Sequence, residues 1–187
     1  MPFFELNDEL KQRKENIIDK GYNVHCLFCL PGTEITLATE LNNNYDYLLA
    51  LPILKMSHRS RNGYKFDVQE PLIPGYIFIY MLEEYDIFHV RTSRFHYRVL
   101  NKDTNKGILD GQDLVYANQI LGINGSISVS EAIKVNGRVK IVNGPLKQLE
   151  GKIIEYSKRS RNCLIEIDFM SRTIRTWLPF DWIDSNL

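Results

Sequence analysis

The sequence predicts an α+β protein of two domains, in which an antiparallel sheet with packed helices is followed by a small β-barrel. Three observations lead to this prediction. Helix-like and strand-like segments alternate through residues 21–122. Residues 123–131 are rich in Gly and Ser and have the composition of a linker. From residue 132 to 187, short runs alternate between apolar and polar side chains, as the strands of a small barrel do.

The composition indicates a soluble protein whose two parts differ in charge. The chain has 187 residues, of which 44% are hydrophobic and 25% are charged. Residues 1–133 carry 13 Lys/Arg and 17 Asp/Glu (13 − 17 = −4), whereas residues 134–187 carry 10 and 6 (10 − 6 = +4). No apolar run reaches the roughly 18 residues of a membrane helix, and the N-terminus has no signal-peptide features. The three cysteines, an odd number, fit a reduced compartment. We therefore expect a monomeric cytoplasmic protein whose two parts have different partners.

The first domain is preceded by an N-terminal extension, residues 1–20, in which the spacing of apolar residues predicts a helix over 7–19. Thr33 can cap the start of a second helix. The carboxylate of Glu34, in the first turn, would interact favourably with the positive end of the helix dipole. Residues 55–66 are interpreted as a polar, basic loop. The remaining segments predict strands at 24–30, 47–54, 76–81 and 95–100, and helices at 34–43, 83–90 and 110–122.

The C-terminal domain is expected to form strands and not a helical hairpin. Gly144, Pro145 and Gly151 would interrupt a long helix, because Gly costs ~1 kcal/mol and Pro ~3 kcal/mol relative to Ala. The alternating runs favour strands near 139–141, 154–156, 163–170 and 174–178.

Catalytic motifs are not recognisable in the chain, so we expect no enzyme, no cofactor and no metal site. Cys26 and Cys29 form a C-x-x-C pair that allows three readings, namely a zinc site, a thiol redox enzyme or buried packing. Because both lie in an apolar run and no second ligand pair exists, we favour packing. The four histidines show no ligand spacing.

Two groups of basic residues are candidates for binding nucleic acid, although either could be a solvated loop. The first is Lys55, His58, Arg59, Arg61 and Lys65. The second lies on the predicted barrel, where we expect the loop 144–151 and the turn 158–161 to meet at one end and bring basic side chains together. Its members are Lys147, Lys152, Lys158, Arg159 and Arg161, with Arg172 and Arg175 further along.

Three separated segments resemble the NusG family of transcription elongation factors. "RVKIVNGPLKQLEGKI" (138–153) is similar to a KOW motif, and "LFCLPGTE" (27–34) resembles the strand, Gly-x-Glu and helix of the NusG N-terminal domain. "PLIPGYIFI" (71–79) resembles that domain's Pro-x-x-Pro-Gly-Tyr-x-Phe strand. The resemblance covers about residues 21–187 and implies an N-terminal domain of NusG type followed by an SH3-like KOW barrel.

Within that family the sequence "GPLKQLEGKI" followed by "KRSR" is most similar to the specialised antiterminator branch of LoaP, related to RfaH. The pair Val24-His25 departs from the family's usual Trp-Tyr. At the family's Phe-Gly-Arg-like turn, which meets Rho or a small-subunit ribosomal protein, this chain has "FMSR" (169–172). That departure favours a specialised role over coupling of transcription to translation.

The resemblance implies that the first domain docks on the clamp of RNA polymerase through Phe28, Tyr76 and Phe78, although some of these could be core. It also implies that the KOW domain binds a structured RNA hairpin, and it allows a contact with DNA near the transcription bubble. Two other functions stay open at this point. One is a general NusG-like elongation factor, and the other is a KOW-containing RNA-binding structural or ribosome-associated protein.

Overall fold

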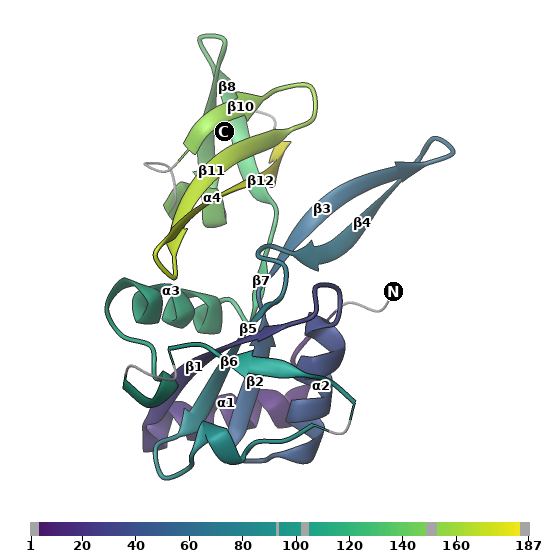
Figure 1. Ribbon diagram of the computed structural model, residues 1–187. Helices are drawn as coiled ribbons and strands as arrows, with labels where there is room; N and C mark the ends of the chain where they lie inside the picture. Colours follow the sequence, from purple (N-terminus) through teal and green to yellow (C-terminus); the bar gives the residue numbers. More distant parts are fainter. Residues whose placement is uncertain (1–3, 93, 102–104, 149–152, 184–187) are drawn as a thin grey trace. The chain divides into compact units, whose positions relative to one another are not determined.

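The computed structural model describes residues 4–92, 94–101, 105–148 and 153–183, which form a mixed α+β protein (Figure 1). The chain divides into two compact units. The N-terminal unit contains the chain up to Leu54 together with Ile73–Gly125, and the C-terminal unit contains Lys55–Leu72 together with Ser126 onwards. No helix in the described part of the chain has the length and apolar character needed to cross a membrane.

The N-terminal unit is built on a four-stranded antiparallel sheet in the order β2-β5-β1-β6. Every residue of β2 and nearly every residue of β5 is buried, so both faces of the sheet are covered. Tyr80 of β5 donates a hydrogen bond to the carbonyl of Ala117 in α3, at 2.6 Å. Helices α1 and α2 pack against β2 and β5. The strands are β1 (Tyr22–Cys29), β2 (Leu48–Pro52), β5 (Tyr76–Leu82) and β6 (Tyr97–Val99), and the helices are α1 (Asp8–Lys20), α2 (Glu34–Asn44) and α3 (Gly111–Gly122).

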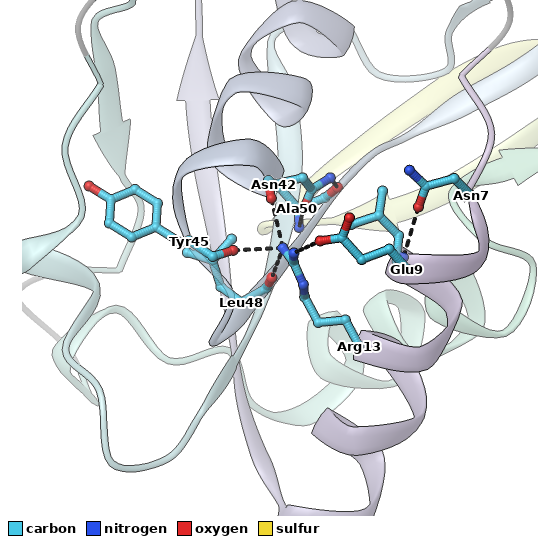
Figure 2. Close-up of polar contacts among 8 residues, drawn as sticks. Asn7, Glu9, Arg13, Asn42, Tyr45, Leu48 and Ala50 are labelled. Atoms are coloured by element: carbon cyan, nitrogen blue, oxygen red, sulfur yellow. Dashed lines mark hydrogen bonds and ion pairs between the residues drawn. The ribbon is translucent and has the colours of Figure 1, made fainter.

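Helix α1, expected as part of a separate extension, is packed into the N-terminal unit. Ile17 is buried against the sheet, and Asn7 caps the helix by accepting from the Leu10 amide at 2.8 Å. Arg13 is also buried, and its Nη1 donates to the carbonyls of Asn42 at 2.8 Å and Tyr45 at 2.6 Å (Figure 2). Because both carbonyls lie at the C-terminal end of α2, a cation is favoured there. The extension is therefore structural and belongs to the first domain.

The segment interpreted as a loop forms a two-stranded ribbon, β3 (Leu54–Arg61) and β4 (Tyr64–Pro71) (Figure 1). Its turn is Asn62-Gly63, in which both residues have positive φ (53° and 81°), as a type I′ turn requires. The loop interpretation is therefore wrong. The Asn-Gly turn was present in the sequence, but the basic composition of the segment indicated a loop. The short strand β7 (Ser126–Ile127) completes a sheet in the order β4-β3-β7, so part of the expected linker is a strand.

Two further expectations for the N-terminal unit need correction. Residues 83–90 do not form an α-helix, and only a 3₁₀ helix, η1 (Ile87–His89), occurs there. A second 3₁₀ helix, η2 (Asn105–Gly107), precedes α3. The predicted strand at 95–100 is reduced to the three residues of β6.

The remainder of the C-terminal unit is a strongly curled five-stranded sheet, which we call the curled sheet (Figure 1). The strand order is β10-β11-β12-β8-β9, with β12 and β8 parallel and the other pairs antiparallel. Alternate residues of β11 are buried, as the apolar/polar alternation predicted. Its elements are β8 (Ser130–Val135), β9 (Arg138–Asn143), the single-turn helix α4 (Pro145–Gln148), β10 (Ile153–Ser157), β11 (Asn162–Phe169) and β12 (Arg172–Trp182).

Candidate functional site

A partly exposed aromatic pair lies at one end of the N-terminal sheet. Phe28 and Tyr76 are directly paired across β1 and β5, and their rings make an edge contact with centroids 5.2 Å apart. On the other side of β1, the guanidinium of Arg98 lies over the Phe28 ring, 5.7 Å from its centroid. Leu30, just beyond the strand, is 70% exposed. These four side chains, which we call the aromatic patch, form a surface suited to an amphipathic partner.

Buried Glu34 holds the backbone that supports this patch. Its side chain accepts hydrogen bonds from the amide of Gly32 at 2.8 Å and from the amide of Gly75 at 2.6 Å, so it ties the start of α2 to the turn before β5. Gly75 has φ +87°, and a Cβ there would lie 2.7 Å from the Phe28 ring. The Gly-x-Glu and Pro-Gly-Tyr motifs are therefore parts of one arrangement that positions Phe28 and Tyr76.

Phe78, the third residue expected to meet the polymerase, is fully buried. It lies in β5, the strand between β2 and β1, and its ring makes an edge contact with Tyr116 of α3 at 6.1 Å. Residues 76 and 78 share one face of the strand, but only the end of that face extends beyond α3. We therefore assign Phe78 to the core and remove it from the candidate contact surface.

The turn between β10 and β11 carries three of the predicted RNA-binding residues, Lys158, Arg159 and Arg161, all exposed. Lys158 Nζ donates to the carbonyl of Gly137, so this turn lies beside the turn between β8 and β9. That second turn is flanked by two more exposed cations, Lys134 and Arg138, which pair with residues on the facing strand. We call these five residues the basic end of the curled sheet: Lys134, Arg138, Lys158, Arg159 and Arg161.

Sequence reasoning missed Lys134 and Arg138. The signal was present in "KVNGRVK" (134–140), where an Asn-Gly turn is flanked by cations. Asn136 and Gly137 both have positive φ, 49° and 77°, as this turn type requires. A hairpin places the residues on either side of its turn close together, so the two cations reach the same end of the sheet.

Lys147 does not join the basic end, contrary to expectation. It lies in α4, which is held at the start of β8 because the Leu146 amide donates to Ser130 Oγ at 2.9 Å. Lys158 is bound to Gly137, beyond the far end of the same strand. At ~3.3 Å per residue, the two anchoring points are about 20 Å apart. Lys152 lies outside the described residues.

Arg172 and Arg175 are exposed but are also separate from the basic end. Arg172 follows the turn after β11, whereas Arg161 precedes that strand, so the length of β11, about 25 Å, separates them. Arg175 Nε forms an ion pair with Glu166 on the neighbouring strand, at 2.9 Å. Of the seven predicted RNA-binding residues, the structure thus groups three.

The cysteines are placed for packing. Cys26 and Cys29 are both buried in β1, and an odd spacing of three along a strand directs their side chains to opposite faces. Burial raises the pKa of both thiols, and it raises the pKa of the Cys163 thiol to about 12. Neutral thiols on opposite faces form neither a redox pair nor a zinc half-site. Within the described residues, no group of three or more His, Cys, Asp or Glu could hold a metal ion.

A polar pocket of about 370 Å³ occurs within the C-terminal unit, lined by ribbon residues and by Trp177. Its charges are paired internally. Lys55 lies 3.5 Å from Glu70, and His58 Nδ1 lies 2.7 Å from Asp67. The charged side chains that line this pocket thus take part in ion pairs.

Neither a protein-family model nor a curated protein matches this sequence.

Proposed function

We propose that this chain is a specialised transcription antitermination factor of the NusG type, which binds RNA polymerase through its N-terminal unit and a leader RNA hairpin through its curled sheet. The observation that carries the proposal is the basic end, where two cations that flank the β8–β9 turn and three cations of the β10–β11 turn lie at one end of the sheet. The proposed polymerase contact is supported by the two segments that resemble the NusG N-terminal domain, residues 27–34 and 71–79. In this proposal the curled sheet corresponds to the KOW barrel.

The polymerase contact is assigned to the aromatic patch, with Phe28 and Tyr76 as its anchors. An exposed pair of rings beside an arginine resembles the energetic centre of many protein interfaces, where truncation of one anchor costs ~2 kcal/mol or more. A factor that binds only the closed, elongating polymerase would lower the population of paused states without any chemical step.

The RNA contact is assigned to the basic end. Its cations lie on one tight turn or flank another, and backbone and side chains can approach a phosphate closely at such turns. Lys supplies charge alone, whereas the planar guanidinium of Arg159 or Arg161 can also bond to base edges or stack on unpaired bases. If about four phosphates are neutralised, log affinity should fall with log salt at a slope of roughly −3 to −4.

The proposed RNA contact is tested with two double variants of the full chain, each of which removes two positive charges. Arg159→Ala with Arg161→Ala alters the basic end, and Arg172→Ala with Arg175→Ala alters the same sheet elsewhere. With a stem-loop RNA from a leader near the gene, we expect the first variant to lose affinity and to reduce the salt slope by about 1–2. Equal effects of both variants would show that only net charge matters and would refute a site at the basic end.

The test of the polymerase half is capture of a bacterial core polymerase by the full chain. Phe28→Ala with Tyr76→Ala should abolish capture, while the matched change of another exposed ring, Phe88→Ala, should not. RNA binding should survive both changes. Retention of RNA binding by a chain that never captures polymerase would favour the alternative, an RNA-binding structural protein.

A further inference from the structure

The β3–β4 ribbon carries the first of the two basic groups of the sequence, which the proposed function does not use. Residues 59–66 contain three Lys/Arg and no Asp/Glu. They lie at the tip of the ribbon, around the Asn62-Gly63 turn (Figure 1). A loop would leave the directions of these side chains undefined, but a ribbon fixes them.

The register of the ribbon places arginines opposite aromatic rings. A two-residue turn at 62–63 makes Arg61 and Tyr64 neighbours across the strands, and Arg59 then faces Phe66. Two contacts agree with this register, because His58 bonds to Asp67 at 2.7 Å and Lys55 lies 3.5 Å from Glu70. Residues directly opposite each other, and those two positions along, share one face. Arg59, Arg61, Tyr64 and Phe66 therefore form a single surface, which we call the ribbon face.

The ribbon face is open to solvent in a way that core packing does not explain. Tyr64 is 80% exposed and Phe66 is 45% exposed. The Arg59 side chain is 60% exposed, although it also donates to Glu70 Oε2 at 2.5 Å, and Arg61 is exposed. Glu70 also accepts a hydrogen bond from Ser57 Oγ at 2.6 Å, which holds the carboxylate that positions Arg59. Two exposed rings beside two exposed arginines, one of them held by Glu70, are unusual on a surface that has no partner.

We propose that the ribbon face binds single-stranded RNA, with bases stacked on Tyr64 and Phe66 and phosphates held by Arg59 and Arg61. Any base can stack on the aromatic rings, and the arginine side chains can pair with the phosphates of the RNA backbone. RNA is favoured over DNA because unpaired bases are the ordinary state of RNA loops, whereas duplex DNA must first be opened. Nucleic acid is favoured over a protein partner because residues 59–66 at the tip carry three Lys/Arg and no Asp/Glu, a one-sided charge that matches a phosphate backbone. This site goes beyond the proposed function, since it lies outside both the aromatic patch and the basic end.

The experiment uses the full chain and a labelled oligouridine of about ten nucleotides, within the roughly 4–16 nucleotides that such grooves cover. Fluorescence anisotropy near 0.15 M salt gives the affinity. Tyr64→Ala and Phe66→Ala should each weaken binding about 5- to 150-fold, the range for loss of one stacked base. Tyr64→Trp should restore binding and Tyr64→Leu should not, because only the first keeps an aromatic face.

Matched controls separate the ribbon from general effects. Phe88→Ala removes a ring of similar exposure outside the ribbon, and Arg94→Ala is the control for Arg61→Ala. Neither control should change oligouridine affinity. All of these positions are exposed, so thermal unfolding should confirm that every variant stays folded. If the ribbon variants bind as tightly as their controls, the proposal is overturned.

Two further arms assign the ligand and its location. Because stacking tolerates any base and both oligomers are unpaired, oligothymidine of the same length should bind about as tightly as oligouridine, whereas a duplex RNA of that length should bind more weakly; equal or tighter binding of the duplex would overturn the assignment to unpaired bases. In a chain with Arg159→Ala and Arg161→Ala, oligouridine binding should persist and should still depend on Tyr64. Loss of oligouridine binding in that background would locate it at the basic end instead. Loss of polymerase capture by Tyr64→Ala, with unchanged RNA affinity, would identify the ribbon as a protein-binding arm.

Discussion

Replacement of Arg13 by Ala should destabilise the N-terminal unit through backbone groups and not through loss of an ion pair. In the structure, Arg13 Nη1 donates to the carbonyls of Asn42 at 2.8 Å, Tyr45 at 2.6 Å and, more weakly, Leu48 at 3.3 Å (Figure 2). Its Nη2 pairs with Glu9 at 2.8 Å, but the Glu9 side chain is 74% exposed. The guanidinium thus completes hydrogen bonds where α2 ends and β2 begins.

The magnitude follows from the burial of these acceptors. An acceptor left without a donor in the interior costs ~1–3 kcal/mol, and bonds from a charged donor lie in the upper part of that range. The Asn42 carbonyl is buried and the Tyr45 carbonyl is partly buried, so we expect the free energy of unfolding to fall by about 2–4 kcal/mol. Glu9→Ala removes only an exposed pair one helical turn away and should cost about 0.5 kcal/mol or less.

The assay is urea denaturation of the full chain, followed with two probes. Helices α1, α2 and α3 all lie in the N-terminal unit, so far-UV circular dichroism reports on it. Both tryptophans, Trp177 and Trp182, lie in the C-terminal unit, so their fluorescence reports on the other. Arg13→Ala should shift the first transition and leave the second unchanged. Equal small shifts for Arg13→Ala and Glu9→Ala would refute the reasoning.

Two further predictions concern buried polar groups of the N-terminal unit. Glu34→Gln should lower its stability by about 1.5–3 kcal/mol, because an amide NH₂ would face the amide donor of Gly32 or Gly75; denaturation midpoints like those of the parent chain would contradict this. His25 Nδ1 lies 2.9 Å from the carbonyl of Gly107, so Nδ1 carries the proton, and burial lowers the pKa of His25 below its ordinary value of 6.5. The folded state then binds fewer protons than the unfolded state in mild acid, so stability is full above about pH 6.5 and falls as the pH drops below it. His25→Phe should flatten this dependence between about pH 7 and pH 5, and an unchanged slope in urea titrations would argue against His25 as its source.

Helices and strands could be predicted from the amino-acid sequence wherever local periodicity and burial agree. Alternation in residues 163–169 predicted β11, and a 3.6-residue spacing predicted α1, α2 and α3 close to their observed bounds, although Thr33, expected to cap α2, makes no side-chain capping bond. These signals are local, since each depends only on which side of one strand or helix faces the core. The Asn62-Gly63 turn was equally local, and the ribbon was missed because its cations were taken as the signature of a loop.

Tertiary structure alone decided which side chains are available to a partner. Phe28 and Phe78 both lie in apolar runs of the sequence. Phe28 lies at an end of the sheet and is partly exposed, whereas Phe78 packs against α3 and is buried. Lys147 and Lys158 are eleven positions apart, yet the length of β8 separates their anchoring points. Burial of one residue depends on contacts that its neighbours in sequence do not specify, because distant segments provide the covering surface. The sequence shows which residues are basic or aromatic. Only the fold shows which of them are exposed and can therefore contact a partner.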